Sequence, residues 1–191
     1  MSNIKPKKSS NPKSISRDNK KTWVIKLGSG GICAPFCEER GIVALGWQMV
    51  NSQLINTASK EILWDHVAKV CEFYNGDRRK ISQGMGQLYR FGQECKVNDY
   101  ILYYDPPNKA VNVCRVTSAA LYRDFDLTND VDCWHYRKVE YPVKPVPILD
   151  FHGSLKGSLL GPRMSFWEMK NGKIGDSPKR GRIKTEGSRH Q

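Results

Sequence analysis

The sequence has no long hydrophobic run. None approaches the ~20 apolar residues that a membrane-spanning helix needs, and the N-terminus lacks the apolar segment of a signal peptide. These absences favour a soluble, intracellular protein, expected in the cytoplasm and without a membrane partner.

Catalytic motifs are also missing. The chain shows no Gly-x-Ser-x-Gly elbow, no phosphate-binding Gly-x-x-x-x-Gly-Lys loop, and no zinc-deaminase pairing of His-x-Glu with Pro-Cys-x-x-Cys. Its four histidines are far apart, and no carboxylates cluster with a lysine after a predicted strand, as a metal nuclease would require. We therefore expect a non-enzymatic protein without a cofactor.

Cysteines are few and widely spaced. Cys33 and Cys37 are separated by three residues, and no second close pair of Cys or His completes a tetrahedral metal site. The other four are Cys71, Cys95, Cys114 and Cys133. Their apolar surroundings predict buried free thiols in preference to zinc ligands or disulfides.

Positive charge is present in excess, and it is concentrated at the two ends. Of the formal net charge of +12, the first 22 residues carry +6 and residues 170–191 carry +5. These ends contain almost no large apolar side chains, which predicts disordered basic arms over 1–21 and 170–191 around one domain at 22–169. Such arms attract phosphate without regard to sequence, although solubilising tails or residues added at the N-terminus are the alternative.

Hydrophobic patterning between the arms predicts short strands at 23–27, 42–45, 100–104, 110–120, 134–143 and 164–169. Strand 42–45 is continuously apolar and is therefore expected in the centre of the sheet. Helices are expected at 32–40, 60–74 and 79–95, with loops at 50–58 and 122–132. Because strands run consecutively after residue 97, the order predicts an α+β protein: a curved sheet or partly open barrel of five or six strands, flanked by two or three helices.

Glycines mark two places where another part of the protein or a ligand is expected to come close to the backbone. Gly84 and Gly86 interrupt the helix expected at 79–95, where each costs about 1 kcal/mol relative to alanine, so another backbone or a ligand is expected nearby. Gly46 precedes Trp47 at the exit of the strand 42–45. An aromatic side chain in that place indicates one wall of a pocket for a flat ligand such as a nucleobase, or else a cap on the core.

Three segments in this order resemble the EVE and YTH branch of the PUA-like superfamily. They are Thr22-Trp-Val-Ile-Lys-Leu-Gly-Ser29, Gly86-Gln-Leu-Tyr-Arg-Phe91 followed by Val97-Asn-Asp-Tyr-Ile-Leu-Tyr-Tyr-Asp105, and Val111 to Thr117. The strand, glycine-rich turn, helix and Gly-Ile-x-x-x-Gly-Trp pattern at 23–47 is most similar to PUA-like domains attached to modification-dependent restriction endonucleases. The resemblance covers most of residues 22–169 and implies a curved β-barrel flanked by helices.

The resemblance also implies a binding site. In that superfamily a modified base is flipped out of its strand into an aromatic cage. Trp47 would be a cage wall that follows Gly46, and backbone groups of Lys26, Leu27, Gly28 and Ser29 would face the base edge. Tyr104 and Asp105 would line the opposite side, with Gln87 and Tyr89 on a facing helix. Asp105 would accept a hydrogen bond from an exocyclic amine, or would instead cap the turn at Pro106 and Pro107.

Three functions follow from these residues and this resemblance. The first is a reader of a modified, for example methylated, base in DNA, part of a restriction-modification system whose nuclease would be a separate partner. The second is an RNA reader of YTH or EVE type, separated from the first by sensitivity to the 2′-hydroxyl. The third is a protein-interaction or nucleotide-binding protein in phage defence or anti-defence, which would bind without a salt dependence.

Overall fold

The computed structural model describes residues 20–123, 132–142, 144–151, 153–161 and 164–169. The predicted tail 170–191, nearly all of the predicted arm 1–21 and most of the predicted loop 122–132 lie outside these ranges. Each helix in the described part of the chain is too short or too polar to cross a membrane.

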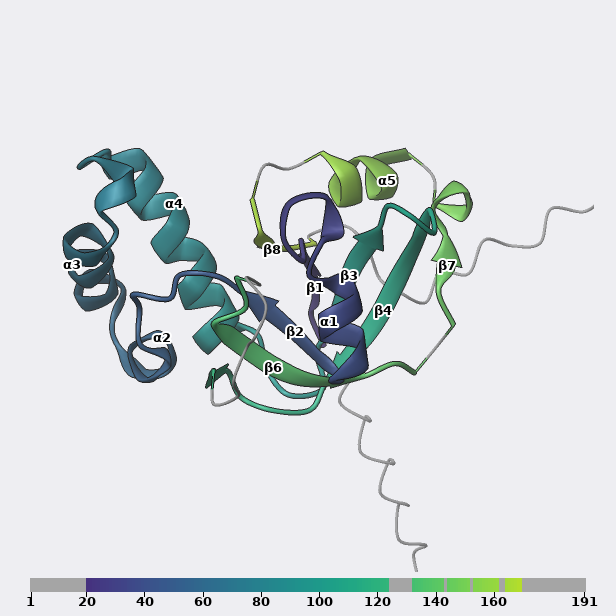
Figure 1. The fold of residues 1–191 in the computed structure, drawn as a ribbon, viewed down its shortest axis with the longest axis horizontal. Helices are drawn as coiled ribbons and strands as arrows, with labels where there is room; N and C mark the ends of the chain where they lie inside the picture. The colour runs from purple at the N-terminus through teal and green to yellow at the C-terminus, as the bar shows by residue number, and fades with distance from the viewer. Residues whose placement is uncertain (1–19, 124–131, 143, 152, 162–163, 170–191) are drawn as a thin grey trace, which may run out of the picture.

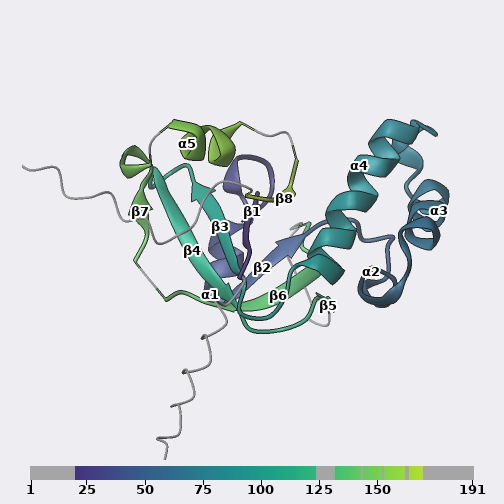
Figure 2. The same cartoon turned by 180° about the vertical axis from the view of Figure 1, so that it is seen from behind.

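The described chain is α+β, with one curled mixed sheet that forms a half-barrel (Figures 1 and 2). The strands are β1 (Thr22–Ile25), β2 (Ile42–Leu45), β3 (Tyr100–Asp105), β4 (Ala110–Val116), β5 (Leu121–Tyr122), β6 (His135–Glu140), β7 (Val146–Pro147) and β8 (Phe166–Glu168). Their order is β2-β6-β4-β3-β1-β8, with β5 added to β6 and β7 added to β4. Among the strand pairs of the described residues, only that of β1 with β3 is parallel.

Helices precede most of the sheet in sequence. They are α1 (Ala34–Glu39), α2 (Ser52–Thr57), α3 (Lys60–Val70), α4 (Arg78–Tyr89) and α5 (Gly153–Leu160). Short turns η1 (Ser29–Gly31), η2 (Glu72–Tyr74) and η4 (Ile148–Asp150) are 3₁₀-helical, and η3 (Arg90–Glu94) continues α4 as a π-helical turn. Helices α2, α3 and α4 form a lobe at one side of the sheet, whereas α1 and α5 lie over it (Figure 1).

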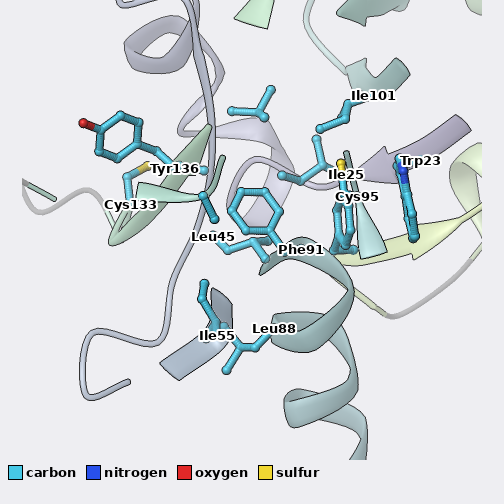
Figure 3. Close-up of a cluster of buried hydrophobic side chains, with 14 of the residues drawn as sticks. Trp23, Ile25, Leu45, Ile55, Leu88, Phe91, Cys95, Ile101, Cys133 and Tyr136 are labelled. Carbon is cyan, nitrogen blue, oxygen red and sulfur yellow. The ribbon is translucent and has the colours of Figure 1, made fainter. Parts of the chain in front are cut away.

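Side chains alternate between two hydrophobic clusters, one on each face of the sheet. Trp23 and Ile25 of β1 belong to the larger cluster, while Val24 belongs to a smaller one with Leu159 of α5. In the larger cluster, Figure 3 shows Phe91, at the end of α4, next to sheet residues. All six cysteines are buried and free, as predicted.

A buried arginine connects the helical lobe to the sheet. The side chain of Arg137, on β6, is 1% exposed, and its guanidinium donates hydrogen bonds to the carbonyls of Phe91, Gly92 and Cys95. These carbonyls lie at the end of the helix, where the backbone acceptors have no partner within the helix. Arg137 therefore fixes the end of α4 against the strand that pairs with β2.

Three predictions about elements are wrong. Strand β2 is at one end of the strand order, not at its centre; it is apolar because it shares the larger cluster with Cys37 of α1, Ile55 of α2 and Leu88 of α4. Residues 50–58 contain helix α2, whose first turn is capped by the Asn51 side chain. Helix α5 and the short strands β5 and β7 were not predicted, so the described chain has more helices than the expected two or three and eight strands in place of five or six.

Candidate functional site

A pocket of about 970 Å³ lies where the sheet meets the helical lobe. Its walls come from the turn after β1, from the exit of β2 and from η2, together with Asp132 and Ser165. The volume is at the upper end of the range for small-molecule sites, so the pocket can hold more than a single ring system.

Trp47 has an unusual backbone conformation in this pocket. Its φ of 66° lies in the left-handed region, which glycine adopts readily and bulky residues adopt rarely. Such a conformation costs about 1 to 3 kcal/mol and persists only when the surroundings enforce it. Here the Trp47 carbonyl accepts hydrogen bonds from Val50 N at 3.0 Å and from His135 Nε2 at 3.1 Å.

The indole of Trp47 is held as well. Its Nε1 donates to the Tyr74 hydroxyl at 2.9 Å. Burial raises the pKa of Tyr74, which keeps this hydroxyl protonated. Behind the tyrosine lies Gly84 of α4, where a Cβ would overlap the hydroxyl and would lie 2.8 Å from Cζ. Gly84 therefore admits the side chain that anchors Trp47. Its close neighbour is thus a side chain and not the backbone or ligand that was predicted, and Gly86 has no close neighbour, its added Cβ lying 3.6 Å from Arg90 Nη1.

We call Trp47, Tyr74 and His135 the inner wall. His135 is fully buried, and burial lowers its pKa to about 4. Since a carbonyl can only accept, Nε2 carries the proton, and the buried Nδ1 has no hydrogen-bond partner among the described residues. The neutral imidazole thus supports the Trp47 backbone at ordinary pH.

The turn after β1 supplies the facing wall. Gly28, Gly30 and Gly31 all have positive φ, so the chain reverses sharply into α1, as predicted. Gly28 is also closely packed, because a Cβ there would lie 2.7 Å from the Cys33 thiol. The compact turn leaves Lys26 and Ser29 exposed beside the pocket.

Asp132 brings a carboxylate into the pocket. It lies against Gly46, where a Cβ would overlap the carboxylate oxygens, so glycine is needed immediately before Trp47. Partial desolvation raises the pKa of Asp132. The site therefore combines an aromatic wall with one acidic group and the cationic side chain of Lys26.

Five of the predicted binding residues line this pocket: Lys26, Gly28, Ser29, Gly46 and Trp47. The other five do not. Leu27 is 2% exposed and packs in the core. Gln87 is buried behind the pocket, where its Oε1 accepts from the backbone N–H groups of Ser165 and Phe166. It thereby positions Ser165, which does line the pocket.

Tyr89, Tyr104 and Asp105 lie elsewhere. The Tyr89 ring contacts Lys60, with Nζ 4.7 Å from the ring centroid. Tyr104 packs against the smaller cluster with α5, on the opposite face of the sheet from Trp23. The Asp105 carboxylate accepts from Asn108 Nδ2 at 2.6 Å, so it has the turn-capping role that was the alternative to amine recognition.

Sequence reasoning missed Tyr74 and Asp132. Tyr74 continues the apolar spacing of α3 and so resembles a core residue, although the Asn75-Gly76 break beside it indicates a turn. Asp132 is at the end of an acidic segment that reads as a solvated loop. The available signal for Asp132 was Gly46, next to Trp47, since the missing Cβ of a glycine leaves room for a neighbouring side chain.

Three thiols lie together beneath the glycine-rich turn. Cys133 forms hydrogen bonds with both Cys33 and Cys37. The hydrogen bond that Cys33 donates to Cys133, together with burial, raises the pKa of Cys33. Across the described ranges, no three His, Cys, Asp or Glu side chains are placed to hold a metal ion.

The pocket opening carries large apolar side chains. Ile32 is 77% exposed, Met49 is 50% exposed and Phe73 is 57% exposed, and all three line the pocket. We call these three residues the mouth. They come from three separate segments: the residues between η1 and α1, the exit of β2 and turn η2.

Comparison of the chain with protein-family models, with curated proteins and with solved structures gives no match.

Proposed function

We propose that this protein is a PUA-like, non-catalytic reader that binds a modified base in DNA after the base is flipped into the pocket beside Trp47. One observation carries the proposal: Trp47 is held in a strained backbone conformation, with its indole hydrogen-bonded in place, at a pocket. Because strain of this kind concentrates at functional sites, the tryptophan is better explained by a ligand than by packing.

A base in this pocket would stack on the Trp47 indole, and the apolar strand residues Ala44 and Leu45 would contact its other atoms. Stacking is worth roughly 1 to 3 kcal/mol per base, which offsets the few kcal/mol needed to extract one. An alkyl modification would add apolar burial at about 25 cal/mol per Å². The remaining volume leaves space for the sugar.

Polar groups in the pocket favour a base that carries an exocyclic amine. Asp132 takes over the acceptor role that the sequence suggested for Asp105, while Lys26 and Ser29 can donate to acceptor atoms of the base edge. On their Watson–Crick edges, cytosine and adenine both present an amine beside a ring acceptor, whereas guanine presents its amine beside a ring N–H and thymine presents no amine. We therefore propose a modified cytosine or adenine as the ligand.

The basic ends would supply affinity that does not depend on sequence. Both attach to the domain at neighbouring points, because Met169 N donates to the Thr22 carbonyl and Lys21 pairs with Glu168. Lys26 follows one end of β1, and these attachment points are at the other end of the β1–β8 pair. At the usual rise of a strand, the attachment points are about 15 Å from Lys26. Affinity for phosphate and recognition of the base would thus be divided between different parts of the chain.

The proposal is tested with a Trp47→Ala variant and short DNA and RNA oligonucleotides that contain 5-methylcytosine, N6-methyladenine or the unmodified base, at two salt concentrations. Loss of one stacking partner should weaken binding of the preferred modified oligonucleotide by about tenfold or more, and leave salt-dependent binding of unmodified DNA intact. Trp64→Ala is the matched control, since Trp64 is on α3 and its Nε1 donates to Ser82.

Equal loss on modified and unmodified oligonucleotides would overturn the assignment of Trp47. A preference for the RNA oligonucleotides would replace DNA by RNA as the target. Failure of the wild-type chain to distinguish any modified base would overturn the proposed function itself.

A further inference from the structure

Exposed hydrophobic side chains are concentrated at the mouth. Of the eight large hydrophobic side chains that are exposed in the described part of the chain, three are Ile32, Met49 and Phe73. Single exposed apolar residues are common on protein surfaces, but a group around one hollow indicates a contact surface.

Phe73 owes its exposure to its neighbour. Turn η2 is closed by hydrogen bonds from Tyr74 N to the Cys71 carbonyl and from Asn75 N to the Glu72 carbonyl. Successive residues of a 3₁₀ turn point about 120° apart, so the inward direction of Tyr74 sends Phe73 outward. The two rings contact each other with centroids 4.3 Å apart. Phe73 is therefore an exposed apolar side chain on a hydrogen-bonded turn beside the pocket.

The arrangement around the pocket suits a polymer. A free nucleotide would occupy only the interior, whereas a base within a strand has a neighbouring base on each side of the opening. A duplex adds a further demand, because removing a base leaves a gap in the stack and an unpaired partner. Phe, Met and Ile are among the side chains that proteins insert between bases to compensate for lost stacking.

We propose that Phe73, flanked by Met49 and Ile32, enters the base stack beside the extracted base, so that the pocket takes its base from a double strand. This inference rests on the proposed function and specifies its substrate as duplex DNA. The inner wall then selects the base, and the mouth lowers the cost of removing that base from the stack.

The test measures binding of the full chain to one modified base, the one that the wild-type protein prefers, in three settings: a paired duplex, the same duplex with an abasic site opposite the modified base, and the single strand. Since unstacking and unpairing cost a few kcal/mol, Phe73→Ser should weaken binding to the paired duplex about tenfold or more. Binding to the single strand should change by less than about twofold, because its bases are unpaired and only weakly stacked. The duplex with the abasic site should show a loss between these two values, because its base is unpaired but still stacked.

Two further variants control for the change itself. Phe73→Leu keeps an apolar wedge and should restore most of the affinity for the paired duplex. Ile62→Ser changes a side chain of similar exposure, 56%, on α3, which does not line the pocket, and should leave all three affinities unchanged.

Equal loss of affinity for the single strand and the duplex would show that Phe73 only adds contact area. No loss for either would show that the mouth takes no part in nucleic-acid binding. Each result would overturn the proposal that Phe73 enters the base stack. Neither would affect the proposed function, provided that the single strand keeps its modified-base preference and its dependence on Trp47.

Discussion

The inner wall and the mouth of the pocket differ in how their side chains are held. Trp47 is fixed through its carbonyl by His135 and through its indole by Tyr74, and the tyrosine is in turn seated against Gly84. Ile32, Met49 and Phe73 are at least half exposed. Both groups are aromatic or apolar. Trp47 and Tyr74 line the same cavity as the three residues of the mouth, while His135 supports Trp47 from behind.

This difference separates two tasks. A side chain that must discriminate between similar bases gains from being placed in advance, because little ordering entropy is then lost on binding. A side chain that enters a base stack must instead project from the surface. The contrast predicts that changes behind the inner wall affect stability and recognition together, while changes at the mouth affect binding alone.

The largest expected effect comes from acid, acting through His135. In the unfolded chain His135 binds a proton near pH 6.5, whereas in the folded protein it does so only near pH 4. Between these pH values the unfolded state carries more protons, so the free energy of unfolding falls as the pH drops. This shift in the pKa of His135 corresponds to about 3 kcal/mol in the free energy of unfolding. Urea unfolding at pH 7 and at pH 4.5 should show most of this loss, since pH 4.5 lies just above the folded-state pKa.

A His135→Gln variant retains a donor for the Trp47 carbonyl without a titratable ring. It should lose clearly less stability between the two pH values than the wild-type protein. An identical loss in both proteins would mean that His135 does not support the inner wall in its neutral form.

The next effect is expected from a single methyl group behind the inner wall. Gly84→Ala places a Cβ against the Tyr74 hydroxyl, which must move and so disturb Trp47. Overpacking of this kind costs about 2 kcal/mol. Urea unfolding should report the loss of stability, and binding of the modified oligonucleotide should weaken although Gly84 does not line the pocket.

Gly86→Ala is the matched control on the same helix. The nearest atom to its added Cβ is Arg90 Nη1 at 3.6 Å, an ordinary contact. Alanine should therefore stabilise the helix by up to about 1 kcal/mol and leave binding unchanged. Similar behaviour of the two variants would show that Tyr74 does not transmit the change.

The smallest effect isolates the backbone strain at Trp47. Trp47→Gly and Trp47→Ala both remove the indole, but only glycine accepts a φ of 66° without cost. The glycine variant should be about 1 kcal/mol more stable than the alanine variant when their unfolding is compared in urea, despite the usual opposite order of these residues. Neither should prefer a modified base. Greater stability of the alanine variant would argue against a strained conformation.

The strands and long helices could be predicted because their signals are local. Alternation in β1 and β4, and the apolar spacing of α3, follow from the fixed periods of strand and helix. The position of β2 could not be inferred, since a continuous apolar run looks the same at the centre of a sheet and at an end that helices cover. The α+β class is observed, while membership of the PUA-like superfamily stays a proposal.

The candidate site was predictable where its residues adjoin a glycine. The turn at Gly28 and the pair Gly46 and Trp47 mark backbone that must bend or make room. Tyr74 and Asp132 reach the pocket from distant segments, and nothing in their immediate neighbours encodes that approach. The sequence left Asp105 with two possible roles, because a carboxylate beside a Pro-Pro turn can bind a ligand or cap the turn; its contact with Asn108 shows the capping role.

Strand β1 has a consequence for the order in which the chain can fold. It is held between β3, from the middle of the sequence, and β8, the last strand described, so neither partner is near it along the chain. Pairings of such high sequence separation slow folding, because loop-closure entropy is lost before contacts compensate for it. During synthesis, β1 must therefore wait for β8 to emerge before the described sheet, and with it the pocket between Lys26 and Ser165, is complete.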